Sequence, residues 1–90
     1  MNKDIFISPQ NLGKKLLQIR EFLNLSQTEM LKRLGFNDRL YRSNISQYER
    51  GEREPPLLVI LSYSKLAGIR VEILIDDEIE LPVHIRKFNG

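Results

Sequence analysis

The chain has 90 residues, a net charge of +2 and no cysteine. This length predicts a single domain with a modest core. Without cysteine there can be no disulfide, thiol catalysis or thiolate metal site, which fits a reducing compartment, so we expect a cytoplasmic protein. The longest apolar run, residues 57–61, is far too short to span a membrane, and residues 1–10 lack the apolar stretch of a secretory signal.

The charge is unevenly distributed along the chain. Residues 1–70 carry 12 basic and 7 acidic side chains, whereas residues 71–85 carry five acidic side chains and no basic one. A basic body suggests an anionic partner. The simpler interpretation is a solvated surface on which charges cluster by chance.

The first predicted helix opens at Ser8-Pro9, because serine can cap free amides and proline is tolerated at the first helical position. Apolar residues then recur at positions 12, 16, 19 and 23, which form one helical stripe. The second helix follows at "LSQTEMLKRLG". Ser26 and Glu29 have the spacing of a capping box, Leu25 and Met30 that of a hydrophobic staple, and Gly35 is a natural terminator.

The third predicted helix, "RSNISQYER", has a narrow apolar edge formed by Ile45 and Tyr48 and ends at Gly51. Residues 36–41, "FNDRLY", join it to the second helix. Asn37 and Asp38 can form a turn there or cap a helical extension, so the start of the third helix stays open.

The fourth predicted helix runs from about Leu57 to Ala67, after two prolines, and a short turn, "VEILID", follows Arg70. Five short helices predict a compact all-α bundle. The fourth helix begins with five consecutive apolar residues, more than a one-sided core helix needs. We expect Leu57, Ile60 and Ser64 to face the bundle. Three further leucines then need a second cover: Leu58, Leu61 and Leu66.

The C-terminal residues show a different period. Apolar residues alternate from Ile79 through Leu81 to residue 85, which predicts an edge strand that could pair with residues 5–7 as a short β ribbon. A disordered tail is the alternative. We therefore divide the chain into a helical domain, residues 1–76, and a tail, residues 77–90. The tail could cover the fourth helix itself, or Ile79 and Leu81 could join a dimer seam.

The second and third helices, with a short join and a polar outer face, predict a helix-turn-helix, a motif whose second helix enters the DNA major groove. Residues 12–75 resemble the Xre family of phage-repressor-like helix-turn-helix domains. The matching segments are "LLQIREFLNLSQTEML", "SNISQYERGEREP" and "LAGIRVEILI". The resemblance implies a five-helix repressor-like fold, binding of operator DNA, and a homodimer.

The resemblance also implies roles for individual residues, each of which could instead be a solvated polar side chain. The expected base-reading residues are Arg42, Ser43, Asn44 and Gln47. The expected phosphate-binding residues are Gln27, Ser46, Arg50 and Arg53. Arg20 and Glu49 are expected to form a structural ion pair. The chain departs from the family in the longer join at residues 36–41, where Arg39 and Tyr41 could add DNA contacts or simply solvate the loop.

These features predict sequence-specific binding of double-stranded DNA by a transcriptional repressor that is a homodimer. The alternative is an antitoxin-like or adaptor module on the same fold, with a protein partner. An enzyme is a remote third hypothesis, because one histidine, no thiol and no convincing carboxylate pair offer little chemistry. We expect no catalytic residue, no metal and no cofactor.

Overall fold

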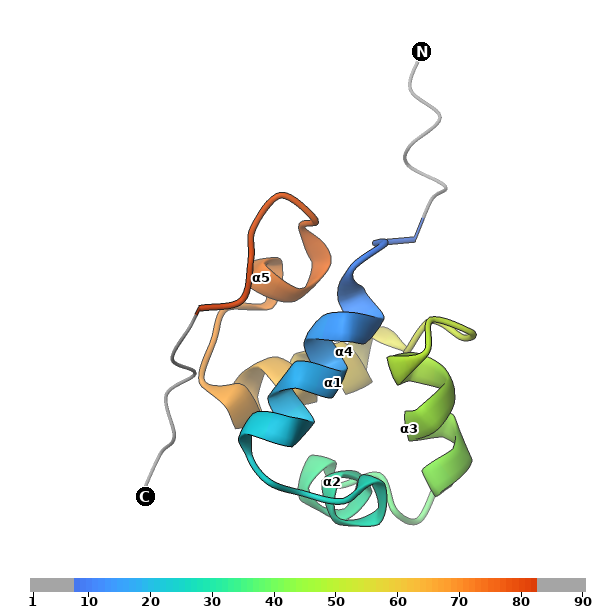
Figure 1. Cartoon of the computed structure of the whole chain (residues 1–90). Coiled ribbons are helices and arrows are strands. Elements are labelled where there is room, and N and C mark those ends of the chain that lie inside the picture. The colour runs from blue at the N-terminus through green and yellow to red at the C-terminus, as the bar shows by residue number, and fades with distance from the viewer. Residues whose placement is uncertain (1–7, 83–90) are drawn as a thin grey trace.

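The computed structural model describes residues 8–82, which form five helices and no strand. The helices are α1 Leu12–Phe22, α2 Gln27–Leu34, α3 Arg42–Glu49, α4 Leu57–Ala67 and α5 Val71–Ile75. α1 contacts α3, α4 and α5, and in the view of Figure 1 it has α3 on one side and α5 on the other. The predicted all-α bundle is confirmed.

One hydrophobic core holds the helices together. Its fully buried side chains come from all five helices: Leu16, Ile19, Met30, Ile45, Val59, Tyr63 and Leu74. Helices of 5 to 11 residues are marginal alone in water, so this shared burial stabilises them. None of the helices within residues 8–82 has the length and apolarity of a membrane span.

The local signals around α2 are confirmed. The N–H of Glu29 donates to the Ser26 hydroxyl over 3.0 Å, and the N–H of Ser26 donates to the Glu29 carboxylate over 2.8 Å. Gly35 ends the helix with a φ of 85°, a left-handed conformation that other residues rarely adopt. Met30 is fully buried and Leu25 packs against the core, as the predicted staple requires.

The predicted start of α1 at Ser8-Pro9 is wrong. The helix begins at Leu12, and the Ser8 hydroxyl donates to the Glu54 carboxylate instead of capping the helix. The backbone N–H groups of Gln10 and Asn11 donate to the two carboxylate oxygens of Asp77, over 2.7 and 3.0 Å. A carboxylate from the far end of the chain therefore satisfies the amides that precede α1.

The predicted orientation of α4 is confirmed at Ile60 and Ser64, which are buried, but is wrong at Leu57. The buried stripe of the helix consists of Val59, Ile60, Tyr63, Ser64 and Ala67. Leu57, expected to face the bundle, is 82% exposed, because this stripe leaves the first residue of the helix on the outer face. Leu66 is half-buried against the core and needs no second cover.

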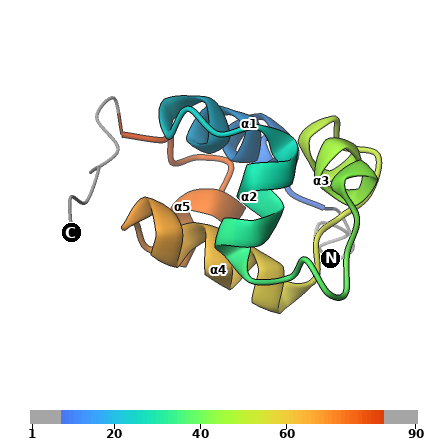
Figure 2. The ribbon, with the colours of Figure 1, turned by 90° about the horizontal axis from the view of Figure 1, so that it is seen from below.

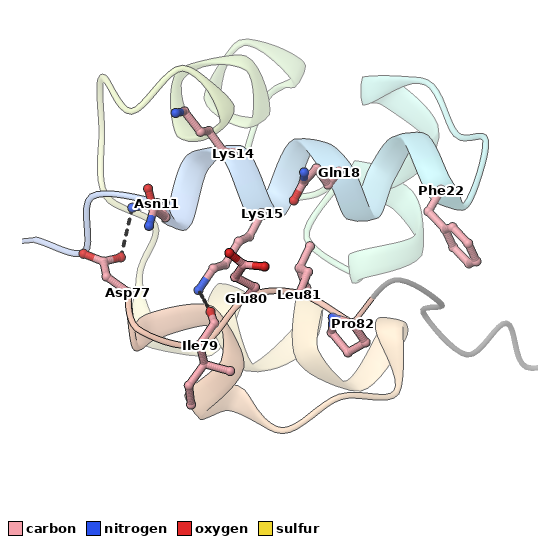
Figure 3. Close-up of a pocket in the computed structure, with 10 residues that line it drawn as sticks. All are labelled: Asn11, Lys14, Lys15, Gln18, Phe22, Asp77, Ile79, Glu80, Leu81 and Pro82. Carbon is pink, nitrogen blue, oxygen red and sulfur yellow. Dashed lines mark hydrogen bonds between the residues drawn. The ribbon is translucent and has the colours of Figure 1, made fainter.

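The segment that follows α5 folds back along α1. The buried Lys15 ammonium donates to the backbone carbonyls of Ile73, Asp76 and Ile79, over 2.7, 3.0 and 2.6 Å (Figure 3). The predicted edge strand is wrong for residues 79–82, whose course is irregular where the carbonyl of Ile79 bonds a lysine. The rest of that prediction, including its pairing with residues 5–7, lies outside the described residues.

Gly13 allows α1 to approach the end of α3 closely. A Cβ atom at this position would lie 2.7 Å from the carbonyl oxygen of Tyr48 and 2.8 Å from that of Glu49. Carbon and oxygen atoms that are not bonded to each other cannot come so close, and both oxygens belong to backbone, so one helix would have to move.

We therefore expect Gly13→Ala to lower the free energy of unfolding by about 1–3 kcal/mol, the usual cost of overpacking. In an ordinary helix the same change would stabilise the protein by about 0.5–1 kcal/mol. Urea denaturation measures whether Gly13→Ala lowers or raises the free energy of unfolding. Lys14→Ala, at the exposed neighbouring position, is the control and should change stability by less than about 0.5 kcal/mol. A stabilised Gly13→Ala variant would contradict the close approach.

The hydrogen bonds to Asp77 predict a contribution to stability that depends on pH. The hydrogen bonds from the N–H groups of Gln10 and Asn11 hold the pKa of Asp77 below its usual range. A depressed pKa contributes stability above the unfolded-state pKa, about 3.9, and this contribution is lost as the pH falls through the folded-state pKa. We expect Asp77→Asn to be less stable than wild type at pH 6 and to lose less stability between pH 5 and pH 3. Thermal unfolding across this range tests it, and parallel curves for the two proteins would exclude a role for Asp77.

Candidate nucleic-acid interface

α2 packs against α3 and α4, and α3 also packs against α1; residues 35–41 join α2 to α3 (Figure 2). α3 buries one edge, formed by Ile45, Tyr48 and Glu49. Its remaining residues leave polar side chains at least partly accessible to solvent. Arg42 and Ser43 are exposed, whereas Asn44, Ser46 and Gln47 are half-buried. The residues expected to read bases therefore lie along one accessible face of a single helix, which we call the α3 face.

The structure places the start of α3 at Arg42. The carbonyl of Phe36 accepts the N–H groups of Arg39 and Leu40, both over 2.9 Å, so residues 36–40 form a turn and not a helical extension. Tyr41 is extended, and its N–H donates to the Asn44 side-chain oxygen over 2.9 Å. The alternative that the sequence left open is resolved in favour of the turn.

Arg20 and Glu49 join α1 to α3 through a bidentate ion pair. Nε of Arg20 donates to Oε2 of Glu49 over 2.6 Å, and Nη2 donates to Oε1 over 3.1 Å. The two side chains are only 17% and 4% exposed. The third nitrogen, Nη1, donates to the carbonyl of Leu25 over 2.9 Å, just before α2. The hydrogen bond with Glu49 raises the pKa of Arg20 above its ordinary value.

Gln27 extends this pair to the protein surface. Its Nε2 donates to Oε1 of Glu49 over 3.0 Å, and its Oε1 accepts from Nη1 of Arg42 over 3.3 Å. A chain of hydrogen bonds thus runs from the buried carboxylate of Glu49 to an exposed guanidinium at the start of α3. No local sequence pattern indicates that Gln27 contacts Glu49, since the two residues are 22 positions apart.

A weaker contact orients Gln47 on the α3 face. Nδ2 of Asn44 donates to Oε1 of Gln47 over 3.4 Å, which is long for a hydrogen bond. Because the carboxamide is planar, an oxygen directed toward Asn44 leaves the amino group of Gln47 pointing the other way.

At the end of α3, Arg50 lies across the last turn. Its Nε donates to the Ser46 hydroxyl over 3.1 Å, and its Nη1 donates to the Glu52 carboxylate over 2.8 Å. Both partners in the ion pair are more than half exposed, so it contributes little to stability and is readily exchanged. Arg53 is exposed in the turn that follows.

The residues expected at a dimer seam fall into two groups. Leu58 and Leu61, on α4, are 65% and 37% exposed and adjoin the exposed Leu57. Leu66 and Leu81 instead pack against the core of their own chain, while Ile79 is 38% exposed. The described part of the tail therefore leaves the three leucines at the start of α4 uncovered. We call Leu57, Leu58 and Leu61 the α4 patch.

In the described part of the chain, no group of three or more histidine, cysteine or acidic side chains could hold a metal ion. A shallow groove lies between α1 and residues 77–82, on the opposite side of α1 from α3 (Figures 1 and 3).

Comparisons with known proteins identify one matching family model and several similar solved structures. Residues 16–74 match a family model described as helix-turn-helix, HTH_3. No curated protein sequence matches the chain. The P22 c2 repressor protein, solved in complex with synthetic operator 9T, is 27% identical with a TM-score of 0.63, over 73% of this chain and 94% of that chain.

Two further solved structures are similar. The restriction-modification controller protein C.AhdI from Aeromonas hydrophila is 29% identical, with a TM-score of 0.60 over 72% of this chain and 92% of that chain. A chain of the SinR–SinI protein complex is 22% identical, with a TM-score of 0.63 over 74% of this chain and 62% of that chain. The last likeness concerns the fold alone.

Glu49→Ala would leave the Arg20 guanidinium without its partner in a mostly buried site. We expect the free energy of unfolding to fall by about 3–5 kcal/mol, the usual cost of breaking a buried ion pair. The exposed pair Arg70–Glu72 is a matched control, and Glu72→Ala should cost less than about 1 kcal/mol. In a double-mutant cycle by urea denaturation, Arg20→Met should cost less in the Glu49→Ala background than in wild type. Additive effects would show that the pair does not couple the two helices.

Proposed function

The chain belongs to the Xre-like helix-turn-helix family whose model matches residues 16–74, and we propose that it binds double-stranded DNA sequence-specifically as a transcriptional repressor. The observation that carries the proposal is the α3 face, which is held in place by the hydrogen-bond chain from Arg20 through Glu49 and Gln27 to Arg42. The operator complex of the P22 c2 repressor, a similar structure, supports it.

In this proposal α3 enters the major groove and its side chains meet the edges of bases. Arg42 would bind guanine and Gln47 adenine, because the guanidinium and the carboxamide each match the paired groups of one base. Ser43 and Asn44 would contact neighbouring base edges. The contact between Arg42 and Gln27 holds the guanidinium before DNA arrives, which lowers the entropy lost on binding.

Phosphate contacts would fix the position of α3 in the groove. Arg50 can exchange its exposed partner Glu52 for a phosphate at little cost. Arg53 follows in the same turn, and the Ser46 hydroxyl supports Nε of Arg50. Gln27, at the first position of α2, keeps a second amide N–H that can bind a phosphate while the first one bonds Glu49.

The α4 patch is the proposed dimer contact. Three exposed leucines close together in the sequence are costly to leave in water, and a second copy of the chain would bury them. A two-fold axis would then set two α3 helices about one turn of DNA, roughly 34 Å, apart. A protein partner on this patch, as in an antitoxin-like or adaptor module, is the rival proposal. Neither proposal requires catalysis, a metal or a cofactor.

The proposed base contact predicts how Gln47→Ala acts. DNA fragments selected from a random pool supply the binding site, and equilibrium titration gives the affinities. Gln47→Ala should lower discrimination at one base pair by about 1–3 kcal/mol and leave the other positions unchanged. Arg50→Ala should lower the affinity for all DNA sequences alike and reduce the slope of log affinity against log salt concentration by about one. Equal weakening of every sequence by Gln47→Ala would make it a positioning residue, and salt-independent binding would favour the protein-interaction rival.

The proposed dimer contact predicts the effect of Leu58→Glu. The variant should fold, because Leu58 is 65% exposed, but sediment as a monomer and bind DNA more weakly. Sedimentation at micromolar concentration with and without DNA measures both properties. Lys14→Glu, at an exposed position on α1 outside the α4 patch, is the control and should stay dimeric. A wild-type protein that is monomeric both free and on DNA would rule the contact out.

A further inference from the structure

The loop that joins α2 to α3 has four exposed side chains, among them those of Arg39 and Tyr41, which come just before the α3 face. Phe36 and Leu40 are half-buried and pack against the core, so they anchor the loop. Arg39 and Tyr41 alternate with these anchors and point outward; Tyr41 is 76% exposed. The loop is thus a fixed structure with one inner and one outer side.

Arg39 is held in position before any ligand binds. Its guanidinium lies 5.3 Å from the centroid of the Phe36 ring, a cation–π contact, and its backbone N–H donates to the Phe36 carbonyl over 2.9 Å. Its ion pair with Asp38 is long, 3.6 Å, and both side chains are mostly exposed, at 68% and 75%. Such a pair contributes little, so the guanidinium can accept an anionic partner at small cost.

A hydrogen bond holds the backbone of Tyr41, whereas its side chain is exposed to solvent. Its N–H donates to the Asn44 side chain, and the next residue is Arg42, whose guanidinium reaches Gln27. In the sequence this exposed tyrosine stands between Arg39 and Arg42, so the segment offers a phenol hydroxyl, an apolar ring and two guanidinium groups. This combination suits a sugar–phosphate backbone, where the hydroxyl and the guanidinium can bind phosphate oxygens and the ring can pack on a sugar.

We propose that Arg39 and Tyr41 form a phosphate-binding clamp that holds the DNA strand flanking the groove at the start of α3. The clamp contributes affinity and positioning but no base reading. It rests on the proposed function, because it has a role only if α3 enters DNA. Its partner is double-stranded DNA, and the contact is the outermost one on the N-terminal side of α3.

The test compares Arg39→Ala with Arg70→Ala in the full chain. Arg70 is exposed and paired with the nearby Glu72, as Arg39 is paired with Asp38, so each variant loses one positive charge from an exposed ion pair. The two differ in position, because Arg70 lies at the start of α5 and not beside α3. Equilibrium binding to fragments selected by the wild type is measured from about 50 to 200 mM salt. One lost phosphate contact reduces the slope of log affinity against log salt concentration by about 0.9. Between about 50 and 200 mM salt, the fold-loss of affinity should therefore be about 3.5 times smaller for Arg39→Ala than for wild type. Arg70→Ala should keep the wild-type slope.

Three further measurements complete the test. Tyr41→Phe should weaken binding to all sequences alike while keeping the salt slope, because it removes a hydrogen bond and no charge. Arg39→Lys should keep the slope, which guards against a folding defect in Arg39→Ala. In ethylation interference, at least one phosphate whose modification hinders the wild type should no longer hinder Arg39→Ala, and the sequence preference should be unchanged.

The outcomes separate the two proposals. If the wild type binds DNA and Arg39→Ala matches Arg70→Ala in slope and interference, the clamp is refuted and the proposed function stands. If Arg39→Ala changes the selected sequence, Arg39 reads a base and the clamp is also refuted. If the wild type shows no salt-dependent binding to DNA, both proposals fail together.

Discussion

The ion pair between Arg20 and Glu49 is the interaction on which the proposed recognition surface depends. A carboxylate only 4% exposed must have partners, and Glu49 finds them on α1 and at the start of α2. The same arginine fixes the carbonyl of Leu25, so the pair sets α1, α2 and α3 relative to one another. α2 and α3 have eight residues each and would not hold this geometry alone. Because separating two buried charges is costly, the ion pair holds α2 and α3, and the side chains on their surface, in fixed positions.

α1 serves as a scaffold with different contacts on its two sides. Toward α3 it offers Gly13, where a side chain would collide with the backbone at the end of α3, and Arg20 two turns later. On the side of α5, the buried Lys15 donates hydrogen bonds to three backbone carbonyls. Asp77 accepts hydrogen bonds from the backbone amides that precede α1. Figure 1 shows α3 and α5 on opposite sides of this helix. The proposed DNA surface and the C-terminal segment are thus positioned by one element and kept apart.

The proposed contacts differ in how firmly they are held before binding. Arg42 and Arg39 are both oriented by neighbours, one by an amide and the other by an aromatic ring. Arg50 is held by an exposed pair that solvent and salt weaken. A surface with ordered side chains at the start of α3 and exchangeable ones at its end can combine base discrimination with adjustable phosphate contacts. The α4 patch is apolar instead, which suits a protein surface.

The sequence by itself determined the features that depend on a few neighbouring residues. The capping box of α2, the left-handed Gly35 and the polar face of α3 could be predicted because the interacting groups lie within one or two turns of one another. The family resemblance added the pairing of Arg20 with Glu49. The helical spacing placed Ile60 and Ser64 correctly on the buried side of α4. Only the tertiary structure decided that Leu57 is exposed and that Leu66 packs against the core, because five consecutive apolar residues have no period that selects a face. It also decided where α1 begins and where residues 77–82 lie, since Asp77 and Lys15 bond partners about 60 residues away, and no local pattern encodes a contact of that kind.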